Sequence, residues 1–212
     1  MKIVGILGSP AVSSRSNSLL QLAQARLQSV ASSMHTISVR DLPGEALLHA
    51  QFDHPLIQQA LLEVSEAQVV LVSTPIYKAA YSGLLKAFLD LLPQDGLRDK
   101  TVLPLATGGS IAHLLALDYA LKPVLSALGA RDILDPVFAT DPQIPKHETQ
   151  GYQPSADVQE RVRRSLQTLL DRAEDFQRQE DAARERDALL SRARGSEELL
   201  APWPTRSVRW SV

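Results

Sequence analysis

The chain contains no cysteine among its 212 residues. This absence excludes disulfide bonds, thiolate metal sites and every enzyme that uses a cysteine nucleophile. It therefore excludes the low-molecular-weight phosphatases, which place a phosphate-binding loop directly after their first strand. The five histidines, at positions 35, 49, 54, 113 and 147, show neither the HxxxH nor the HExxH spacing of common metal sites. We therefore expect no metal centre.

Long hydrophobic runs and a strong charge bias are also missing. No apolar segment is long enough to span a bilayer, and the first residues lack the charged and apolar regions of a secretory leader. The formal net charge is only −2, so the chain as a whole is not drawn to nucleic acid or to anionic membranes. Hydrophobic residues make up 44% of the chain, which is enough to bury a substantial core in one domain. We expect a cytoplasmic globular protein with no nucleic-acid or membrane partner.

A strand, a loop and the start of a helix are predicted within residues 1–20, MKIVGILGSPAVSSRSNSLL. Backbone N–H groups at a helix N-terminus can hold a phosphate dianion, and the helix dipole adds to this attraction. Arg15 lies among serine and asparagine side chains that can also donate hydrogen bonds. Neither Gly-Lys-Ser/Thr nor G-x-G-x-x-G follows the strand, which disfavours ATP, GTP and Rossmann-type dinucleotides. We interpret the segment as a phosphate-binding loop; the alternative is a serine-rich loop that only connects and caps.

Apolar runs and amphipathic segments alternate along the rest of the chain. Runs typical of strands occupy residues 2–7, 34–40, 68–73, 100–106 and 133–138, and helical segments separate them. The run QVVLVS is apolar on both faces, as in a buried parallel strand. A helix entrance is predicted at Asp53-His54-Pro55, where a capping side chain precedes a proline. This alternation predicts an α/β protein with a doubly wound, five-stranded parallel sheet and helices on both faces.

Three segments follow strands whose carboxyl ends should meet at one edge of this sheet. They are residues 9–18, residues 74–83 and residues 107–110. The second contains a rigid proline turn and the aromatic face of Tyr77, and the third lets the backbone of two glycines approach a flat ring. A phosphate site beside an aromatic shelf suits a phosphorylated planar heterocycle, and flavin mononucleotide (FMN) is the natural candidate. Taken alone, Tyr77 could equally be a half-buried aromatic residue and Lys78 a solvated charge.

The segment after residue 110 predicts a helix that is apolar over more than half of its circumference. One face of a sheet cannot cover so wide an apolar surface, so we expect this helix to be buried against another subunit. Pro123 lies inside the helix, where it cannot donate to the carbonyl of Tyr119 and would cost roughly 3 kcal/mol if uncompensated. A kink or a wide turn around Tyr119 is therefore predicted.

Three runs resemble the NADPH-dependent FMN reductase family, in particular the reductases of two-component alkanesulfonate monooxygenase systems. They are GSPAVSSRSNSLL, TPIYKAAYSGLLKAFLDLLP and VLPLATGGSIAHLLALDYALKPVLSALGA, within residues 1–150. The resemblance implies a flavodoxin-like fold, hydride transfer from NADPH to FMN and release of reduced FMN to a partner monooxygenase. It also implies a homotetramer, in which Asp118-Tyr119-Ala120 forms a π-type turn at an interface near the flavins. A plain interface aromatic is the alternative for Tyr119.

The resemblance also implies the residues of the flavin site. The FMN phosphate would contact Ser9, Arg15, Asn17 and Ser18, with Asn17 in place of the hydroxyl residue that is common in the sulfonate branch. The isoalloxazine ring would contact Pro75, Ile76, Tyr77, Lys78, Thr107, Gly108 and Gly109. No general acid or base is assigned, because the flavin itself accepts the hydride.

Beyond the pocket segments, residues 141–145 and 151–154 predict a long polar loop that could cover the flavin edge, and Ser155 should cap a final helix. We assign residues 1–178 to the reductase domain. Residues 179–212 would form a charged helical extension, in which acidic and basic residues balance, and a C-terminal tail. The tail, Ser196 to Val212, is predicted to be disordered, with a docking peptide as the alternative.

Three functions remain open from the sequence. The leading hypothesis is a reductase that supplies free reduced FMN for alkanesulfonate desulfonation. In the second, FMN stays bound and passes electrons to quinones or azo dyes. The third is a flavodoxin-like electron carrier, which is disfavoured because such carriers are usually strongly acidic. NADPH and NADH cannot be distinguished, because the sequence contains no separate dinucleotide motif.

Overall fold

The computed structural model describes residues 1–174, 178 and 186. The chain divides into two compact units, Met1–Asp171 and Arg172–Val212. All strands that the described residues form lie in the first unit. The predicted extension over residues 179–212 lies outside the described residues, apart from residue 186. Within the described part of the chain, no helix combines the length and the apolar character needed to cross a membrane.

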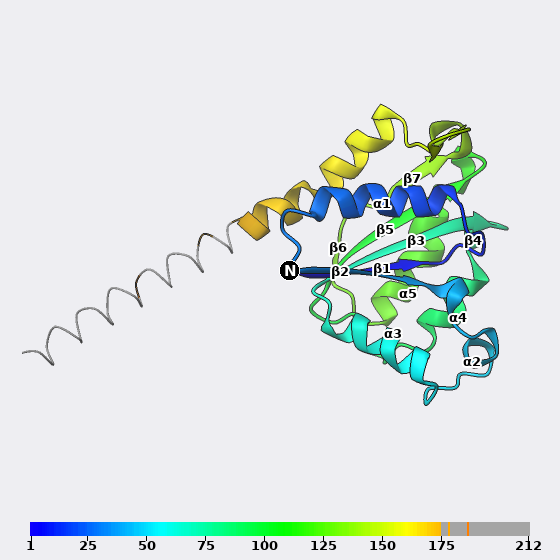
Figure 1. Cartoon of the computed structure of the whole chain (residues 1–212), viewed down its shortest axis with the longest axis vertical. Helices are drawn as coiled ribbons and strands as arrows, with labels where there is room; N and C mark the ends of the chain where they lie inside the picture. Colours follow the sequence, from blue (N-terminus) through cyan, green and yellow to red (C-terminus); the bar gives the residue numbers. More distant parts are fainter. Residues whose placement is uncertain (175–177, 179–185, 187–212) are drawn as a thin grey trace, which may run out of the picture. The chain divides into compact units, whose positions relative to one another are not determined.

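A parallel sheet runs through the middle of the first unit (Figure 1). Its first four strands are, in spatial order, β2 (Ser33–Ser38), β1 (Lys2–Leu7), β3 (Val69–Tyr77) and β5 (Thr101–Gly108). Two short strands, β6 (Asp132–Ile133) and β7 (Val137–Thr140), share the fifth position, and each pairs with β5. The chain moves outward from β1 to β2 and then crosses to β3 on the other side of β1. The predicted doubly wound sheet with five parallel positions is confirmed, and the change of direction lies between β1 and β3.

Predicted strands 34–40 and 100–106 are shifted by at most two residues at either end, as β2 and β5. Two other strands differ more, and proline explains both differences. The last predicted strand, 133–138, is divided into β6 and β7 around Pro136, which has no N–H to donate to a neighbouring strand. The central strand runs on beyond Ser73 to Tyr77 through Pro75. Pairing with β1 ends at Ser73, so the missing N–H of Pro75 costs no ladder hydrogen bond on that side. The extended end of β3 then pairs with β4 (Ala80–Tyr81) as an antiparallel hairpin.

Helices cover both faces of the sheet (Figure 1). One core cluster joins odd-numbered residues of β1, β3 and β5 to α1 (Arg15–Leu27) and to the helix of residues 156–171. The other joins even-numbered residues of the same strands to α2 (Gly44–Leu48), α3 (Pro55–Glu66), α4 (Gly83–Leu89) and α5 (Lys122–Ala127). This alternation is the period of two that a strand buried on both faces imposes.

The chain between β5 and β6 is not one continuous helix. It contains a 3₁₀ turn at Ile111–His113, a π-helix at Leu117–Leu121 and then α5. The wide turn predicted around Tyr119 is confirmed by the π-helix. As a result Pro123 lies in the first turn of α5, a position at which proline is tolerated, directly after the π-helix.

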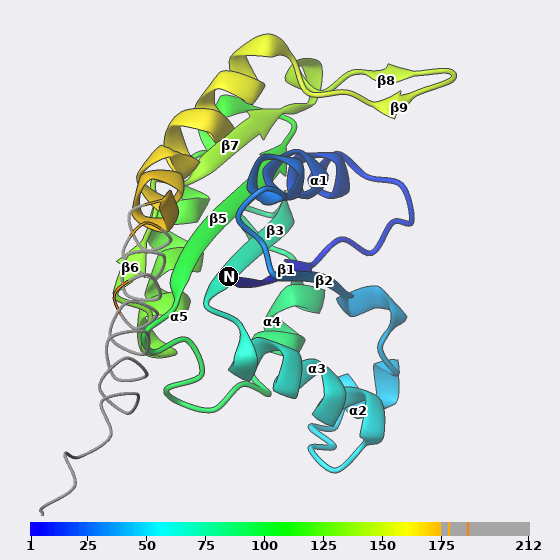
Figure 2. The ribbon, with the colours of Figure 1, turned by 60° about the vertical axis from the view of Figure 1, so that its left-hand side comes forward.

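Residues 141–154, predicted as a long polar loop, have regular structure instead. A 3₁₀ turn at Asp141–Gln143 is closed by Gln143 Oε1, which accepts from the backbone N–H of Thr140 at 2.9 Å. A short antiparallel hairpin follows, formed by β8 (Lys146–His147) and β9 (Gly151–Tyr152), and Figure 2 shows it projecting from the edge of the unit. Ser155 Oγ accepts from Val158 N at 3.5 Å and caps the next helix, as predicted.

Candidate functional site

The site begins in the loop between β1 and α1. Ser14 is the N-cap residue of α1, and its Oγ accepts a hydrogen bond from Asn17 N at 3.1 Å. Arg15 and Ser16 follow in the first turn, where backbone N–H groups have no partner within the helix. At the other end of the loop the buried Ser9 Oγ accepts from Ala11 N at 3.3 Å. Hydroxyls and free N–H groups therefore gather in the segment that the sequence predicts to hold a phosphate.

A network of buried hydroxyl groups fixes this loop to the sheet. Ser73 Oγ, from β3, donates to the carbonyl of Ser16 at 2.8 Å, and the Ser16 hydroxyl shares a 2.8 Å hydrogen bond with Thr107, from β5. Ser82 Oγ, the N-cap of α4, donates to the carbonyl of Gly8 at 2.5 Å. Gly8 N in turn donates to Ser73 O at 2.8 Å. Each bond joins residues far apart in sequence, so the shape of the loop is set by the assembled sheet.

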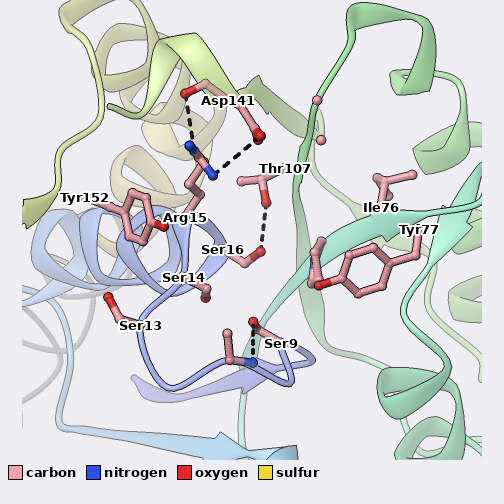
Figure 3. A pocket seen from close by; sticks show the side chains of 14 residues that line it. Ser9, Ser13, Ser14, Arg15, Ser16, Ile76, Tyr77, Thr107, Asp141 and Tyr152 are labelled. Carbon is pink, nitrogen blue, oxygen red and sulfur yellow. Dashed lines mark hydrogen bonds and ion pairs between the residues drawn. The ribbon is translucent and has the colours of Figure 1, made fainter. Parts of the chain in front are cut away.

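A cavity of about 240 Å³ opens between the loop and the ends of β3 and β5 (Figure 3). Predicted site residues from all three segments line it: Ser9, Arg15, Pro75, Ile76, Tyr77, Thr107, Gly108 and Gly109. The lining also includes Ala11, Ser13, Ser14, Ser16, Asp141 and Tyr152. The predicted meeting of the three segments at the carboxyl edge of the sheet is therefore present in the structure.

Three predicted site residues do not line this cavity. Asn17 and Ser18 follow the lining residues Arg15 and Ser16 in α1. Ser18 Oγ is buried with no hydrogen-bond partner among the described residues. Lys78 is exposed in the turn between β3 and β4. Both turn residues, Lys78 and Ala79, have positive φ angles of 49° and 63°, a conformation that costs about 1 kcal/mol or more in residues other than glycine. This strained turn holds Tyr77, half-exposed, at the edge of the cavity.

Arg15 is held by the segment 141–152 rather than standing free over the loop. Its Nε donates to the carbonyls of Asp141 at 3.3 Å and of Ile144 at 3.1 Å. Its Nη1 lies 3.5 Å from Asp141 Oδ2, and its guanidinium lies 4.8 Å from the centre of the Tyr152 ring. Figure 3 shows Arg15, Asp141 and Tyr152 together on one side of the cavity and Tyr77 on the other.

Asp141 and Tyr152 are the lining residues that lie outside the three segments assigned to the site from the sequence. The available signal was the prediction that residues 141–154 could cover the flavin edge, which places the segment near the site but selects no residue within it. Their position depends on the 3₁₀ turn and the β8–β9 hairpin, and neither produces a hydrophobic period in the sequence.

Charged and titratable groups are few at the site itself. Among the described residues, Arg15 is the only basic and Asp141 the only acidic residue that lines the cavity. Partial burial raises the pKa of the Tyr81 hydroxyl, in β4, above its ordinary value of 10.0. The described residues contain no group of three or more histidine, aspartate or glutamate side chains able to hold a metal ion. The site is therefore a polar anion-binding loop beside an aromatic and glycine surface.

The segment that carries Tyr119 exposes several large apolar side chains. Ile111 is 66% exposed, Leu115 57% and Tyr119 79%, and the π-helix containing Tyr119 contacts β4, which adjoins the cavity-lining end of β3. Tyr119 itself does not line the cavity. Of the leucines that make this segment apolar, Leu117, Leu121 and Leu125 are buried in the core of the same chain, so only the exposed residues are left for the subunit contact that the sequence predicts.

The chain is similar in sequence to known flavin reductases. A model of the NADPH-dependent FMN reductase family matches residues 1–143. Over 172 residues the chain is 51% identical to the FMN reductase (NADPH) of Pseudomonas putida strain KT2440, a match that covers 80% of this chain and 86% of that protein. Over 170 residues it is 46% identical to the FMN reductase (NADPH) of Escherichia coli K12, with 80% and 88% covered.

A solved structure is similar in fold and in sequence. The apo form of the NADH:FMN oxidoreductase EMOB superposes with a TM-score of 0.70 and 40% identity, over 78% of this chain and 86% of that one. The fold, the cavity at the carboxyl edge of the sheet and these similarities lead to one assignment. The chain belongs to the NADPH-dependent FMN reductase family.

Proposed function

We propose that the protein is an NAD(P)H-dependent FMN reductase that binds FMN as a substrate and releases it after reduction. The observation that supports this most directly is the cavity, which joins an anion-binding loop to an aromatic and glycine surface within one site. Phosphate and isoalloxazine, the two ends of FMN, need these two kinds of surface.

The residues present fit the FMN phosphate. The first turn of α1 supplies backbone N–H groups, and Ser9, Ser13 and Ser14 add hydroxyls. Ser18 Oγ, on the second turn, is buried without a partner among the described residues. Because Ser18 does not line the cavity, the proposed phosphate contacts are those of the loop and of the first turn of α1. Arg15 would contribute the positive charge.

The ring would lie between Tyr77 and the glycines at the end of β5. An ideal Cβ on Gly109 meets no atom within 4 Å, so the backbone there is open to an approaching flat ring. When bound, FMN supplies the chemistry by accepting a hydride at N5 from the nicotinamide. The chain's task is to hold the ring in place, and the hydroxyl network prepares the loop for this before FMN arrives.

The size of the cavity supports FMN as a substrate rather than a permanently enclosed group. At about 240 Å³ the cavity is smaller than the roughly 300–1,000 Å³ of most ligand pockets. The described residues of one chain would therefore enclose only part of FMN, which fits release of the flavin after reduction.

We also propose that the exposed apolar segment 111–119 is an interface between copies of this chain in a homotetramer, with Tyr119 at its centre. The support is the exposure of Ile111, Leu115 and Tyr119 on one segment next to the site. Replacing Tyr119 and Leu115 by serine should lower the oligomeric mass in sedimentation experiments. An unchanged mass would contradict this assembly.

The partner monooxygenase, and alkanesulfonate as its substrate, rest on the similarity of three sequence segments to the reductases of those systems. A coupled assay tests them: the protein, NADPH, FMN, an alkanesulfonate and a purified reduced-flavin-dependent sulfonate monooxygenase should release sulfite only when all are present. The cytoplasmic location stays a prediction from the sequence.

The test of the proposed function is anaerobic reduction of a large molar excess of FMN by NADPH. Bleaching of many FMN molecules per protein molecule, with flavin eluting apart from the protein in gel filtration, would support a substrate role. Reduction of a single equivalent that co-elutes, with turnover only after a quinone or azo dye is added, would support the bound-flavin oxidoreductase. No NADPH oxidation under any condition would favour an electron carrier.

Two alanine variants link that activity to the cavity. Gly109→Ala should raise the KM for FMN about tenfold, because the new methyl stands where the ring approaches. Gly83→Ala is the matched control, since a Cβ there also meets nothing within 4 Å but Gly83 does not line the cavity. Equal KM values in the two variants would contradict this placement of the ring.

A further inference from the structure

An acidic side chain stands inside the anion-binding half of the cavity. Among the described residues, Arg15 and Asp141 are the only charged ones that line the cavity. Arg15 Nη1 lies 3.5 Å from Asp141 Oδ2. Their charges cancel, so the side chains of the cavity offer no net positive charge to a phosphate. A carboxylate beside a bound anion weakens the binding of that anion, because like charges repel, so a site that retains its anion tightly gains nothing from it.

The Asp141 carboxylate is not needed to orient Arg15. Two main-chain carbonyls, of Asp141 and Ile144, accept from Arg15 Nε at 3.3 Å and 3.1 Å, and the Tyr152 ring stacks on the guanidinium. The carboxylate contact of 3.5 Å is longer than either of these hydrogen bonds. The main chain of the 3₁₀ turn is itself held by Gln143 on Thr140. Removing only the charge of Asp141 should therefore leave Arg15 in place.

We propose that Asp141 lowers the affinity for the flavin phosphate and so makes FMN a ligand that leaves after reduction. The carboxylate competes with the phosphate for Arg15 and repels it, since both are anions within one small cavity. This inference rests on the proposed function, because it assumes that the phosphate of FMN binds beside Arg15. It gives Asp141 a role in tuning affinity, and no part in hydride transfer.

The expected effect is moderate because Asp141 is partly exposed. Its side chain is 46% accessible, so water screens the repulsion between the carboxylate and the phosphate. We expect Asp141→Asn to lower the Kd for FMN about fivefold, as for a charge interaction at a half-exposed site. The change should appear mainly as slower dissociation, because the loop that FMN enters is unchanged.

A titration with riboflavin distinguishes an effect of Asp141 on the phosphate from an effect on the binding of the flavin ring. It carries the same ring without the phosphate, so its Kd should be the same for wild type and Asp141→Asn, whereas the Kd for FMN should fall. Glu148→Gln is the matched control: Glu148 is exposed in the turn of the β8–β9 hairpin and outside the cavity lining, and its replacement changes net charge by the same amount. Neither Kd should change in this control.

The measurement is a flavin titration by fluorescence quenching with wild type, Asp141→Asn, Asp141→Ser and Glu148→Gln. Tighter FMN binding in both Asp141 variants, with riboflavin unchanged, would support the proposal. Weaker or equal FMN binding would overturn it, and weaker binding would assign the carboxylate to orienting Arg15. Parallel tightening of riboflavin would also overturn it. If wild type reduced FMN while the variants showed no tightening, only this inference would fail; if wild type bound no flavin, the proposed function would fail with it.

Discussion

Among the described glycines, Gly8 has the least room for a side chain, and its replacement by alanine gives the sharpest test of how the loop is held. An ideal Cβ on Gly8 would lie 2.6 Å from Leu85 Cβ and 3.2 Å from Ser82 Oγ. Leu85 Cβ is bonded directly to the backbone of α4, so no rotation of the side chain removes the clash. Ordinary contact begins at 3.4 Å, so the loop and α4 must move apart by about 0.8 Å.

That movement has two costs. Overpacking of a buried site lowers the free energy of unfolding by roughly 1–3 kcal/mol. The Ser82 Oγ hydrogen bond to Gly8 O, 2.5 Å long, is stretched at the same time, and a buried hydrogen bond contributes about 1 kcal/mol. We therefore expect Gly8→Ala to lower the free energy of unfolding by about 2–4 kcal/mol. FMN affinity should fall about tenfold, because the displaced loop no longer presents its donors together.

Urea denaturation followed by circular dichroism without flavin measures the first effect, at one protein concentration for all variants. Gly44→Ala is the control, because a Cβ on Gly44 meets nothing within 4 Å; its free energy of unfolding should stay within about 0.5 kcal/mol of wild type. Unfolding of Gly8→Ala at the wild-type urea concentration would refute the reasoning. It would mean that β1 and α4 are not held together at this point.

Three further variants test other features. Thr107→Val keeps the side-chain shape but leaves the Ser16 hydroxyl without its partner, so the free energy of unfolding in urea should fall by about 1–3 kcal/mol, and Thr107→Ser should restore it. Ala79→Gly relieves a φ of 63° and should raise that free energy by about 1 kcal/mol; an unchanged or lower value would contradict the strain. Tyr81 binds its proton more tightly in the folded chain, so its contribution to stability is complete below pH 10.0 and is lost as the pH rises through the raised pKa. In an ultraviolet pH titration, Tyr81→Phe should remove a tyrosinate component above the ordinary range, and persistence of that component would disprove the assignment.

Much of the fold could be predicted because the central strands pack against a separate hydrophobic core on each face and are therefore apolar on both faces. Apolar residues on both faces of 68–73 indicate a parallel strand, and the chain between strands has helical periodicity. A kink or a wide turn around Tyr119 was also predictable, since Pro123 cannot donate inside an α-helix, whereas the π type of the turn at Leu117–Leu121 was implied only by the family resemblance. These features depend on neighbours along the chain, which a sequence displays directly.

The remaining features depend on contacts between distant segments. Pro75 looks like a turn residue, yet it continues β3 because β1 has already ended beside it. The hairpin after it has Lys78 and Ala79 in its turn, without the glycine or asparagine that signals such a turn. The partners of Arg15, including Asp141, lie more than a hundred residues away in a segment with no period of its own. Only the assembled sheet brings them together.

The buried hydroxyl network around the loop has a consequence for the kinetics of binding. The carbonyls of Gly8 and Ser16 already accept hydrogen bonds from Ser82 and Ser73, so the loop does not have to refold around an arriving phosphate. The remaining adjustment, at the partly buried side chain of Arg15, involves no refolding of the main chain. In stopped-flow mixing, FMN should therefore bind in a single phase whose rate constant rises linearly with flavin concentration and reaches no plateau.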